Sequence, residues 1–271
     1  MDIIRSRSNS KVRSARSLRQ RKMRDENGTF LAEGIHLAGA AMEAGVQIES
    51  IFYAPDLLKS EFGLDLIEKA SANAVPCYPT SADVFTTLAS KEHPQGILAV
   101  VQQSEQQLSE LTPENFSWGV ACVAPQDPGN VGAILRTIDA VGANGLVLLE
   151  GGVDAYHPTA VRASMGAIFR QLVARATFAE FAEWAVKLGY HIYGTSSRGS
   201  QVYREIDRYD LPMILLLGSE GQGLTEEQTG ICEHMLRIPM KGGVTSLNLA
   251  VSAGVLLYDV FGRTADGETG Y

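Results

Sequence analysis

Three loops rich in glycine and small polar residues constrain the second half of this chain most strongly. They cover residues 127–132, 218–224 and 241–248, and each follows an apolar run. Apolar strands that alternate with helices are typical of a mostly parallel sheet covered on both faces. Ligands of such sheets bind just beyond the carboxyl ends of the strands. We therefore expect an α/β domain in which the three loops converge on one ligand.

The apolar runs and periodic segments of this half predict its elements. Strands are expected at residues 119–124, 145–149, 190–194 and 212–217, a further strand ending at 238–240, and helices at 133–141, 178–188 and 249–260. A short helix is expected within 154–170, which holds Pro158.

Several interpretations of the loops compete. Thr245, Ser246 and Asn248 precede an apolar helix, so they fit helix caps as well as a binding site. A phosphate-binding P-loop needs Lys and Ser or Thr after its last glycine, which none of the loops has. The dinucleotide motif GxGxxG lies in a first strand–helix turn and has a different spacing from GSEGQG. An uncharged or cationic ligand, held by backbone groups near Glu220, fits better.

The first hundred residues predict a separate, smaller α/β domain. Strands are expected at residues 29–32, 48–53, 75–78 and 96–102, and helices at 35–44, 64–72 and 82–89. The polar, acidic stretch that follows reads as a linker. The predicted boundaries are 1–103 for the first domain, 104–116 for the linker and 117–271 for the second domain.

Charge is distributed unevenly along the chain. The first 24 residues carry nine basic side chains against one acid, although the whole chain has a net charge of −8. A basic arm on an acidic body is typical of a protein that touches a polyanion with one face. The alternative is a solvated helix that buries Val12, Ala15 and Leu18. We favour RNA contact, through Arg13, Arg16, Arg19, Arg21 and Lys22.

Composition narrows the class of protein. The 271 residues are 45% hydrophobic and 20% charged, as in ordinary soluble proteins, and the length suits two domains. The chain has no apolar run long enough to span a bilayer, and its start lacks an apolar signal core. Cys77, Cys122 and Cys232 are far apart, so neither a disulfide framework nor a zinc site is indicated. We expect a cytoplasmic protein with no metal and no membrane partner.

Three motifs in order resemble those of the SpoU (TrmH-type) RNA 2′-O-methyltransferases of the SPOUT class. They are DPGNVGAILRT from Asp127, LLLGSEGQGL from Leu215 and IPMKGGVTSLNLAVSAGVLLYD from Ile238. The segment VRASMGAIFR from Val161 is also similar to the family. FLAEGIHL from Phe30 is similar to the family's substrate-binding domain, which has a ribosomal-protein-like fold.

The resemblance implies a deep trefoil knot in the second domain, bent S-adenosylmethionine bound in it, and a homodimer with the site at the subunit interface. It further implies two sets of site residues. The cofactor would be held by Thr195, Gly218, Ile238, Met240 and Leu247. Arg136 matches the catalytic arginine of the family. The residues that match those orienting this arginine, the ribose and the cofactor are Asn130, Glu220, Ser246 and Asn248.

The implied reaction needs few chemical groups. Methyl transfer from a sulfonium to a ribose hydroxyl expels a neutral thioether, so the leaving group needs no metal or acid. The protein has to position the two reactants and help to remove the hydroxyl proton. Arginine is a poor base because it is almost always protonated. Either the pKa of Arg136 is strongly lowered in the site, or it binds a neighbouring phosphate that assists departure of the proton. Both possibilities stay open at this point.

The substrate is less constrained than the reaction. Thr245 stands where the family often has Glu, which weakens the transfer of substrate detail through that position. The separate first domain and its basic arm favour ribosomal RNA over transfer RNA. The rival hypotheses are an inactive RNA-binding protein of the same fold and a nucleotide-binding hydrolase.

Overall fold

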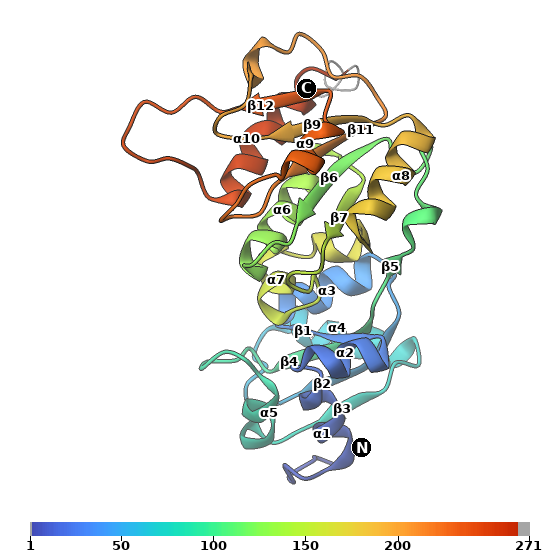
Figure 1. The fold of residues 1–271 in the computed structure, drawn as a ribbon. Helices are drawn as coiled ribbons and strands as arrows, with labels where there is room; N and C mark the ends of the chain where they lie inside the picture. The colour runs from blue at the N-terminus through green and yellow to red at the C-terminus, as the bar shows by residue number, and fades with distance from the viewer. Residues whose placement is uncertain (1, 265–271) are drawn as a thin grey trace. The chain divides into compact units, whose positions relative to one another are not determined.

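The computed structural model describes residues 2–264 and divides the chain into two compact units (Figure 1). Unit 1 comprises the residues up to Ser104 together with Tyr156–Arg170, and unit 2 comprises Glu105–Ala155 and the residues from Gln171 on. The segment from Tyr156 to Arg170 is therefore an excursion from unit 2 that packs within unit 1.

Unit 1 is built on a four-stranded sheet with the order β1-β4-β2-β3. β4 lies antiparallel to β1 and β2, and β2 pairs with β3 in parallel. The strands are β1 (Thr29–Glu33), β2 (Ile48–Tyr53), β3 (Cys77–Pro79) and β4 (Ile97–Gln102). The helices are α1 (Ser10–Ser17), α2 (Arg21–Asn27), α3 (Ile35–Glu43), α4 (Glu61–Ala72), α5 (Ala82–Leu88), α7 (Pro158–Ala163) and the 3-10 turn η2 (Ala167–Phe169). The predicted elements of the first half are all present, with β3 starting two residues later.

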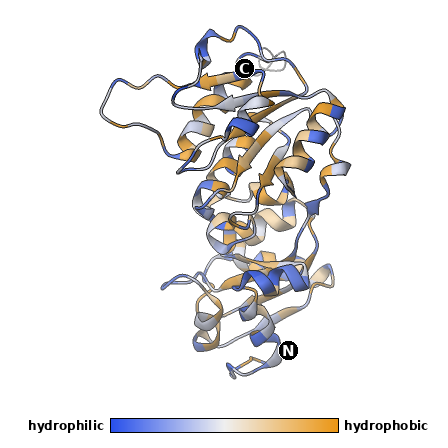
Figure 2. Ribbon diagram, viewed as in Figure 1, coloured by the Kyte–Doolittle hydropathy of each residue, from blue (hydrophilic) through white to orange (hydrophobic). Residues whose placement is uncertain are grey.

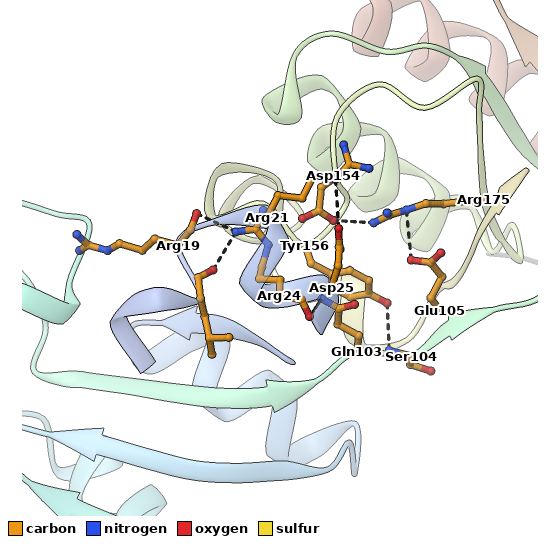
Figure 3. Close-up of polar contacts among 11 residues, drawn as sticks. Arg19, Arg21, Arg24, Asp25, Gln103, Ser104, Glu105, Asp154, Tyr156 and Arg175 are labelled. Carbon is orange, nitrogen blue, oxygen red and sulfur yellow. Dashed lines mark hydrogen bonds and ion pairs between the residues drawn. The ribbon is translucent and has the colours of Figure 1, made fainter. Parts of the chain in front are cut away.

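The basic arm is folded into unit 1. Val12, Ala15 and Leu18 are buried with α5 in one core cluster, as the amphipathic interpretation required. Arg24 is 1% exposed, and its guanidinium donates to the carbonyl oxygens of Leu18 and Arg19, both at 2.9 Å (Figure 3). Figure 2 shows the neighbouring α2 as hydrophilic along its length. Arg24, one of the basic residues of the arm, therefore stabilises the turn between α1 and α2.

Unit 2 is an eight-stranded sheet with the order β10-β12-β9-β11-β6-β7-β8-β5, and every pair in it is parallel. The strands are β5 (Glu105–Gln106), β6 (Trp118–Val123), β7 (Gly145–Leu149), β8 (Leu172–Ala176), β9 (His191–Thr195), β10 (Gln201–Val202), β11 (Met213–Leu217) and β12 (His234–Arg237). The helices are η1 (Leu108–Glu110), α6 (Pro128–Val141), α8 (Phe178–Leu188), η3 (Tyr203–Glu205), α9 (Glu226–Gly230) and α10 (Leu249–Phe261). The predicted α/β class with a parallel sheet is confirmed.

Alternating side chains of the sheet pack against helices on its two faces. Val123, Val147 and Leu216 share a core cluster with Phe181 and Trp184 of α8. Figure 1 shows α6 and α10 on the opposite side of the sheet. Figure 2 shows the central strands as mostly hydrophobic, which is expected where both faces are covered.

Strand order fixes where a ligand can bind. From β6 the sheet grows through β7 and β8 in one direction, whereas β11, β9 and β12 lie on its other side. The order therefore reverses between β6 and β11, and open parallel sheets bind ligands beyond the carboxyl ends of their strands at such a point. The loops that leave β6, β9, β11 and β12 all begin at that edge.

The segment predicted as a linker contains regular structure within unit 2. β5 pairs with β8, and Leu111 and Phe116 are buried in the unit 2 core. Arg175 of β8 forms ion pairs with Glu105 at 3.2 Å and with Asp154 at 2.9 Å (Figure 3). The sequence did not predict these contacts, because most side chains of the stretch are polar and only a few face the core. As functional domains, the ranges 1–103 and 117–271 stay predictions.

Other local differences have identifiable causes. α6 begins at Pro128 instead of residue 133, because the Asp127 carboxylate accepts from Gly129 N–H at 2.7 Å and caps the helix. β12 ends at Arg237, so the expectation of a strand reaching Met240 is wrong. β8 had no counterpart in the prediction.

Candidate active site

A pocket of about 850 Å³ lies at the reversal point of the unit 2 sheet. Its walls come from the loops after β9, β11 and β12 together with the first turns of α6 and α10. All five predicted cofactor residues line it, namely Thr195, Gly218, Ile238, Met240 and Leu247. Four of the predicted catalytic residues line it as well, namely Asn130, Glu220, Ser246 and Asn248.

A chain of hydrogen bonds ties three of these segments together at the pocket wall. Asn130 donates from Nδ2 to Glu220 Oε1 at 2.8 Å, and Asn248 donates from Nδ2 to Asn130 Oδ1 at 2.9 Å. The second oxygen of Glu220 accepts from Gln126 N–H at 2.9 Å. Because a carboxylate can only accept, Glu220 fixes which end of the Asn130 amide faces it. The first, second and third glycine loops are thus joined by side chains 90 and 118 residues apart.

Asn248 serves as helix cap and as part of this chain. Its Oδ1 accepts from Ala250 N–H at 2.9 Å and Val251 N–H at 3.3 Å at the start of α10, while its Nδ2 reaches Asn130. The cap interpretation is therefore confirmed for Asn248, whereas its role in catalysis stays a prediction. Thr245 and Ser246 lie in the exposed loop before it and line the pocket.

The second loop is a tight turn that requires glycine. Ser219 and Gly223 exchange two backbone hydrogen bonds, at 3.2 and 2.9 Å. A Cβ on Gly218 would lie 2.3 Å from the carbonyl carbon of Gly223, which is backbone and cannot move aside. By contrast, a Cβ on Gly242 or Gly243 would meet no atom within 4 Å, and neither residue lines the pocket.

Arg136 is apart from the pocket in the single chain. It is exposed on α6 and forms no hydrogen bond or ion pair within the described residues 2–264. Six residues of helix separate it from Asn130, which is about 9 Å along the axis and a different helical face. Its expected place beside the glycine loops stays a prediction that one chain does not test.

The five predicted RNA-binding side chains differ in how strongly they are engaged within unit 1. Arg19 donates to the carbonyl oxygens of Leu88 and Ala89 at the end of α5. Arg21 and Lys22 each face an acid one helical turn away, at 3.6 and 3.7 Å. Arg13 is exposed and Arg16 half-buried on α1, and neither forms a hydrogen bond or ion pair with another described residue.

Cys122 on β6 is a fully buried thiol. Burial and the nearby Glu220 carboxylate raise the pKa of the Cys122 thiol on β6, so it stays protonated and is a poor nucleophile. Among residues 2–264, no group of three or more His, Cys, Asp or Glu side chains could hold a metal ion. In the same range, no helix is long and apolar enough to cross a membrane.

The loop after β9 also forms a wall of the pocket, and of its residues only Thr195 was predicted. Ser196, Ser197 and Arg198 all line it. A signal was available, because this loop follows an apolar strand in the same way as the three glycine loops. Its serines and single glycine made it look like an ordinary turn.

Two family models match the chain. The model described as the SpoU rRNA Methylase family matches residues 118–258, and the MRM3-like substrate binding domain matches residues 9–99.

Similar proteins extend the match over nearly the whole chain. The 23S rRNA (guanosine(2553)-2′-O)-methyltransferase RlmP of Bacillus subtilis is 31% identical over 97% of this chain and 100% of its own length. The 23S rRNA (uridine(2479)-2′-O)-methyltransferase of Streptomyces viridochromogenes is 29% identical over 93% of this chain and 89% of its own.

Solved structures agree in fold. The AdoMet-bound rRNA methyltransferase from Sinorhizobium meliloti has a TM-score of 0.86 at 32% identity, covering 96% of this chain and 97% of that one. The SpoU methyltransferase AviRb from Streptomyces viridochromogenes, in complex with AdoMet, has a TM-score of 0.82 at 26% identity, with coverage of 93% and 97%. The motifs, the family model and the full-length relatives agree, and the chain belongs to the SpoU rRNA methylase family.

Proposed function

We propose that this protein transfers a methyl group from S-adenosylmethionine to a ribose 2′-hydroxyl of ribosomal RNA. The observation that carries the proposal is the hydrogen-bonded chain Asn248–Asn130–Glu220, which joins the three family motifs at one pocket. The relatives named above act on 23S ribosomal RNA, and two of the similar structures hold the cofactor.

The pocket suits this cofactor in size and chemistry. Its volume falls within the range of about 300–1,000 Å³ that is usual for small-molecule sites. Ile238, Met240 and Leu247 supply apolar surface for the adenine, and backbone groups of the turn at Gly218 supply hydrogen bonds. When bound, the cofactor supplies an electrophilic methyl group on a positively charged sulfur. Glu220 is an acid on the same wall, which complements that charge.

We further propose that Arg136 acts in the active site of a partner subunit. The exposed side of α10 carries Val251 and Tyr258, which are 52% and 56% exposed, with Gly254 between them. An exposed apolar face of this kind marks an interaction surface. α6 packs against α10, so an isologous contact through this face would bring Arg136 of one subunit towards the other. Arg136 would then bind the substrate phosphate and orient the ribose.

Three remaining expectations belong to the same proposal. A trefoil knot is expected in the second domain, with Thr195 in one of the loops near the cofactor. The MRM3-like segment of unit 1 would bind the RNA substrate, with Arg13 and Arg16 on its surface. We infer a cytoplasmic location, because the three cysteines are free and disulfides are rare there.

The activity is tested with purified protein, S-adenosylmethionine carrying a labelled methyl group, and ribosomal or transfer RNA. We expect label in ribosomal RNA, at a ribose 2′-oxygen that resists alkaline cleavage on its 3′ side. Label in transfer RNA alone would mean that the substrate is transfer RNA and not ribosomal RNA. Binding of S-adenosylhomocysteine without methylation of any cellular RNA would identify an inactive RNA-binding member of the family.

The role of Arg136 in the partner's site is tested by mixing two inactive variants. Arg136→Ala lacks the arginine and Glu220→Ala lacks the pocket carboxylate, so each homodimer should be inactive. In a mixed dimer, the pocket of the first subunit meets the arginine of the second, and one complete site forms. Statistical exchange makes about half of the dimers mixed, so about a quarter of wild-type activity should return. If Arg136 serves its own subunit, every site stays defective and no activity returns.

A further inference from the structure

The loop that follows β9 is held rigidly against the neighbouring strands of unit 2. Ser196 N–H donates to Leu236 O at 3.0 Å, and Gly199 N–H closes a turn on Ser196 O at 3.1 Å. A Cβ at Gly199 would lie 2.5 Å from the carbonyl oxygen of Met235, so this position needs glycine. At the other end, the Thr195 hydroxyl donates to Leu216 O at 3.2 Å.

This loop presents Arg198 to the pocket. The backbone N–H of Arg198 donates to Ser196 Oγ at 3.1 Å, which fixes the position from which its side chain starts. The side chain is exposed, lines the pocket, and forms no hydrogen bond or ion pair with any residue in 2–264. A guanidinium whose backbone is fixed and whose donors are unused is prepared to bind a planar anion.

The charges around the pocket single out one part of the ligand. Among the lining residues, Arg198 is the cation and Glu220 the acid, and both oxygens of Glu220 already accept hydrogen bonds from this chain. S-adenosylmethionine carries two positive groups, the sulfonium and the amine, and one negative group, the carboxylate. The complement of Arg198 on this ligand is therefore the carboxylate.

We propose that Arg198 forms the carboxylate subsite of the pocket and selects for cofactors that retain the amino-acid group. The proposal rests on the proposed function, because it assumes S-adenosylmethionine as the ligand. A charge-assisted pair from a fixed loop would discriminate against adenosine thioethers that lack the carboxylate. Nothing in the three family motifs assigns this role, since Arg198 lies outside all of them.

The test compares two ligands by isothermal titration in the absence of RNA. S-adenosylhomocysteine keeps the carboxylate, and decarboxylated S-adenosylhomocysteine keeps the amine and lacks only that group. For Arg198→Gln, we expect the Kd for the first ligand to rise about tenfold or more, with the Kd for the second unchanged. For Arg198→Lys, the Kd for S-adenosylhomocysteine should lie between those of the wild type and Arg198→Gln. Arg208→Gln, an exposed arginine of the same unit outside the pocket, is the control and should change neither Kd.

Each other outcome contradicts the assignment in a distinguishable way. Equal loss of affinity for both ligands would mean that Arg198 supports the loop rather than the carboxylate. Unchanged affinity for both, with weaker RNA binding, would assign Arg198 to an RNA phosphate. Failure of the wild-type protein to bind S-adenosylhomocysteine would refute the proposed function itself and this subsite with it.

Discussion

Replacing Asn130 by Asp tests whether the hydrogen-bonded chain holds the pocket together. The substitution keeps the shape of the side chain but puts a carboxylate oxygen where Nδ2 donates to Glu220 at 2.8 Å. A hydrogen bond to a charged group contributes about 1.5–3 kcal/mol, and two like charges replace it. Glu220 is exposed, so water screens the repulsion. We therefore expect the free energy of unfolding to fall by about 1–2 kcal/mol at pH 8.

The sign of the pH dependence distinguishes repulsion from a packing defect. Two facing carboxylates raise the pKa of one of them in the folded variant. A raised folded-state pKa means that protonation favours the folded state, so the deficit of Asn130→Asp should shrink as the pH falls towards about 5. Urea unfolding at several pH values measures this. Gln222→Glu, which adds the same charge to the pocket without touching Asn130, is the control. A deficit that is absent, or the same at all pH values, would refute the reasoning.

Two further predictions concern the arm and the turn. The double variant Arg13→Gln, Arg16→Gln should weaken RNA binding. It should also reduce the slope of log K against log salt by about 1–2, because each phosphate contact contributes about 0.7–0.9 to that slope. A filter-binding assay at several salt concentrations measures the slope, and an unchanged slope would exclude both residues as phosphate contacts. Gly218→Ala should abolish binding of S-adenosylhomocysteine and lower the melting temperature, because its Cβ would collide with backbone. Gly242→Ala is the control, since its Cβ has open space and the variant should bind the ligand normally. Calorimetric titration of both variants measures binding, and normal binding by Gly218→Ala would contradict the prediction.

Much of the fold could be predicted because its elements carry local signals. Asp127, Ser81 and Thr177 stand before helices and accept from their first-turn N–H groups, as their residue types indicate. The buried run Met213–Leu217 could hardly be other than a central strand. β8 was missed because Arg175 interrupts its apolar pattern, and that arginine proved to be paired with acids inside unit 2.

The excursion Tyr156–Arg170 shows what local signals cannot reveal. Its sequence is continuous with the second domain and similar to the family's, yet it packs within unit 1. Arg162 donates to Ser90 Oγ at 2.6 Å, and Glu33 binds the same hydroxyl. A Cβ on Gly166 would lie 2.8 Å from the Cβ of Ala40. The contacts that Arg162 and Gly166 make join residues 72 or more positions apart, so no window along the chain contains them.

Prediction of the candidate site depended on the family resemblance far more than prediction of the fold did. Asn130, Glu220 and Asn248 are ordinary turn, loop and cap residues when each is considered alone. The structure shows why that description is true and incomplete: the amide of Asn248 uses its oxygen to cap α10 and its nitrogen to bind Asn130. An amide has separate donor and acceptor atoms, so one side chain can fix a helix start and a pocket wall together. A group anchored in this way loses little freedom when a ligand binds, which favours precise positioning of the reacting atoms.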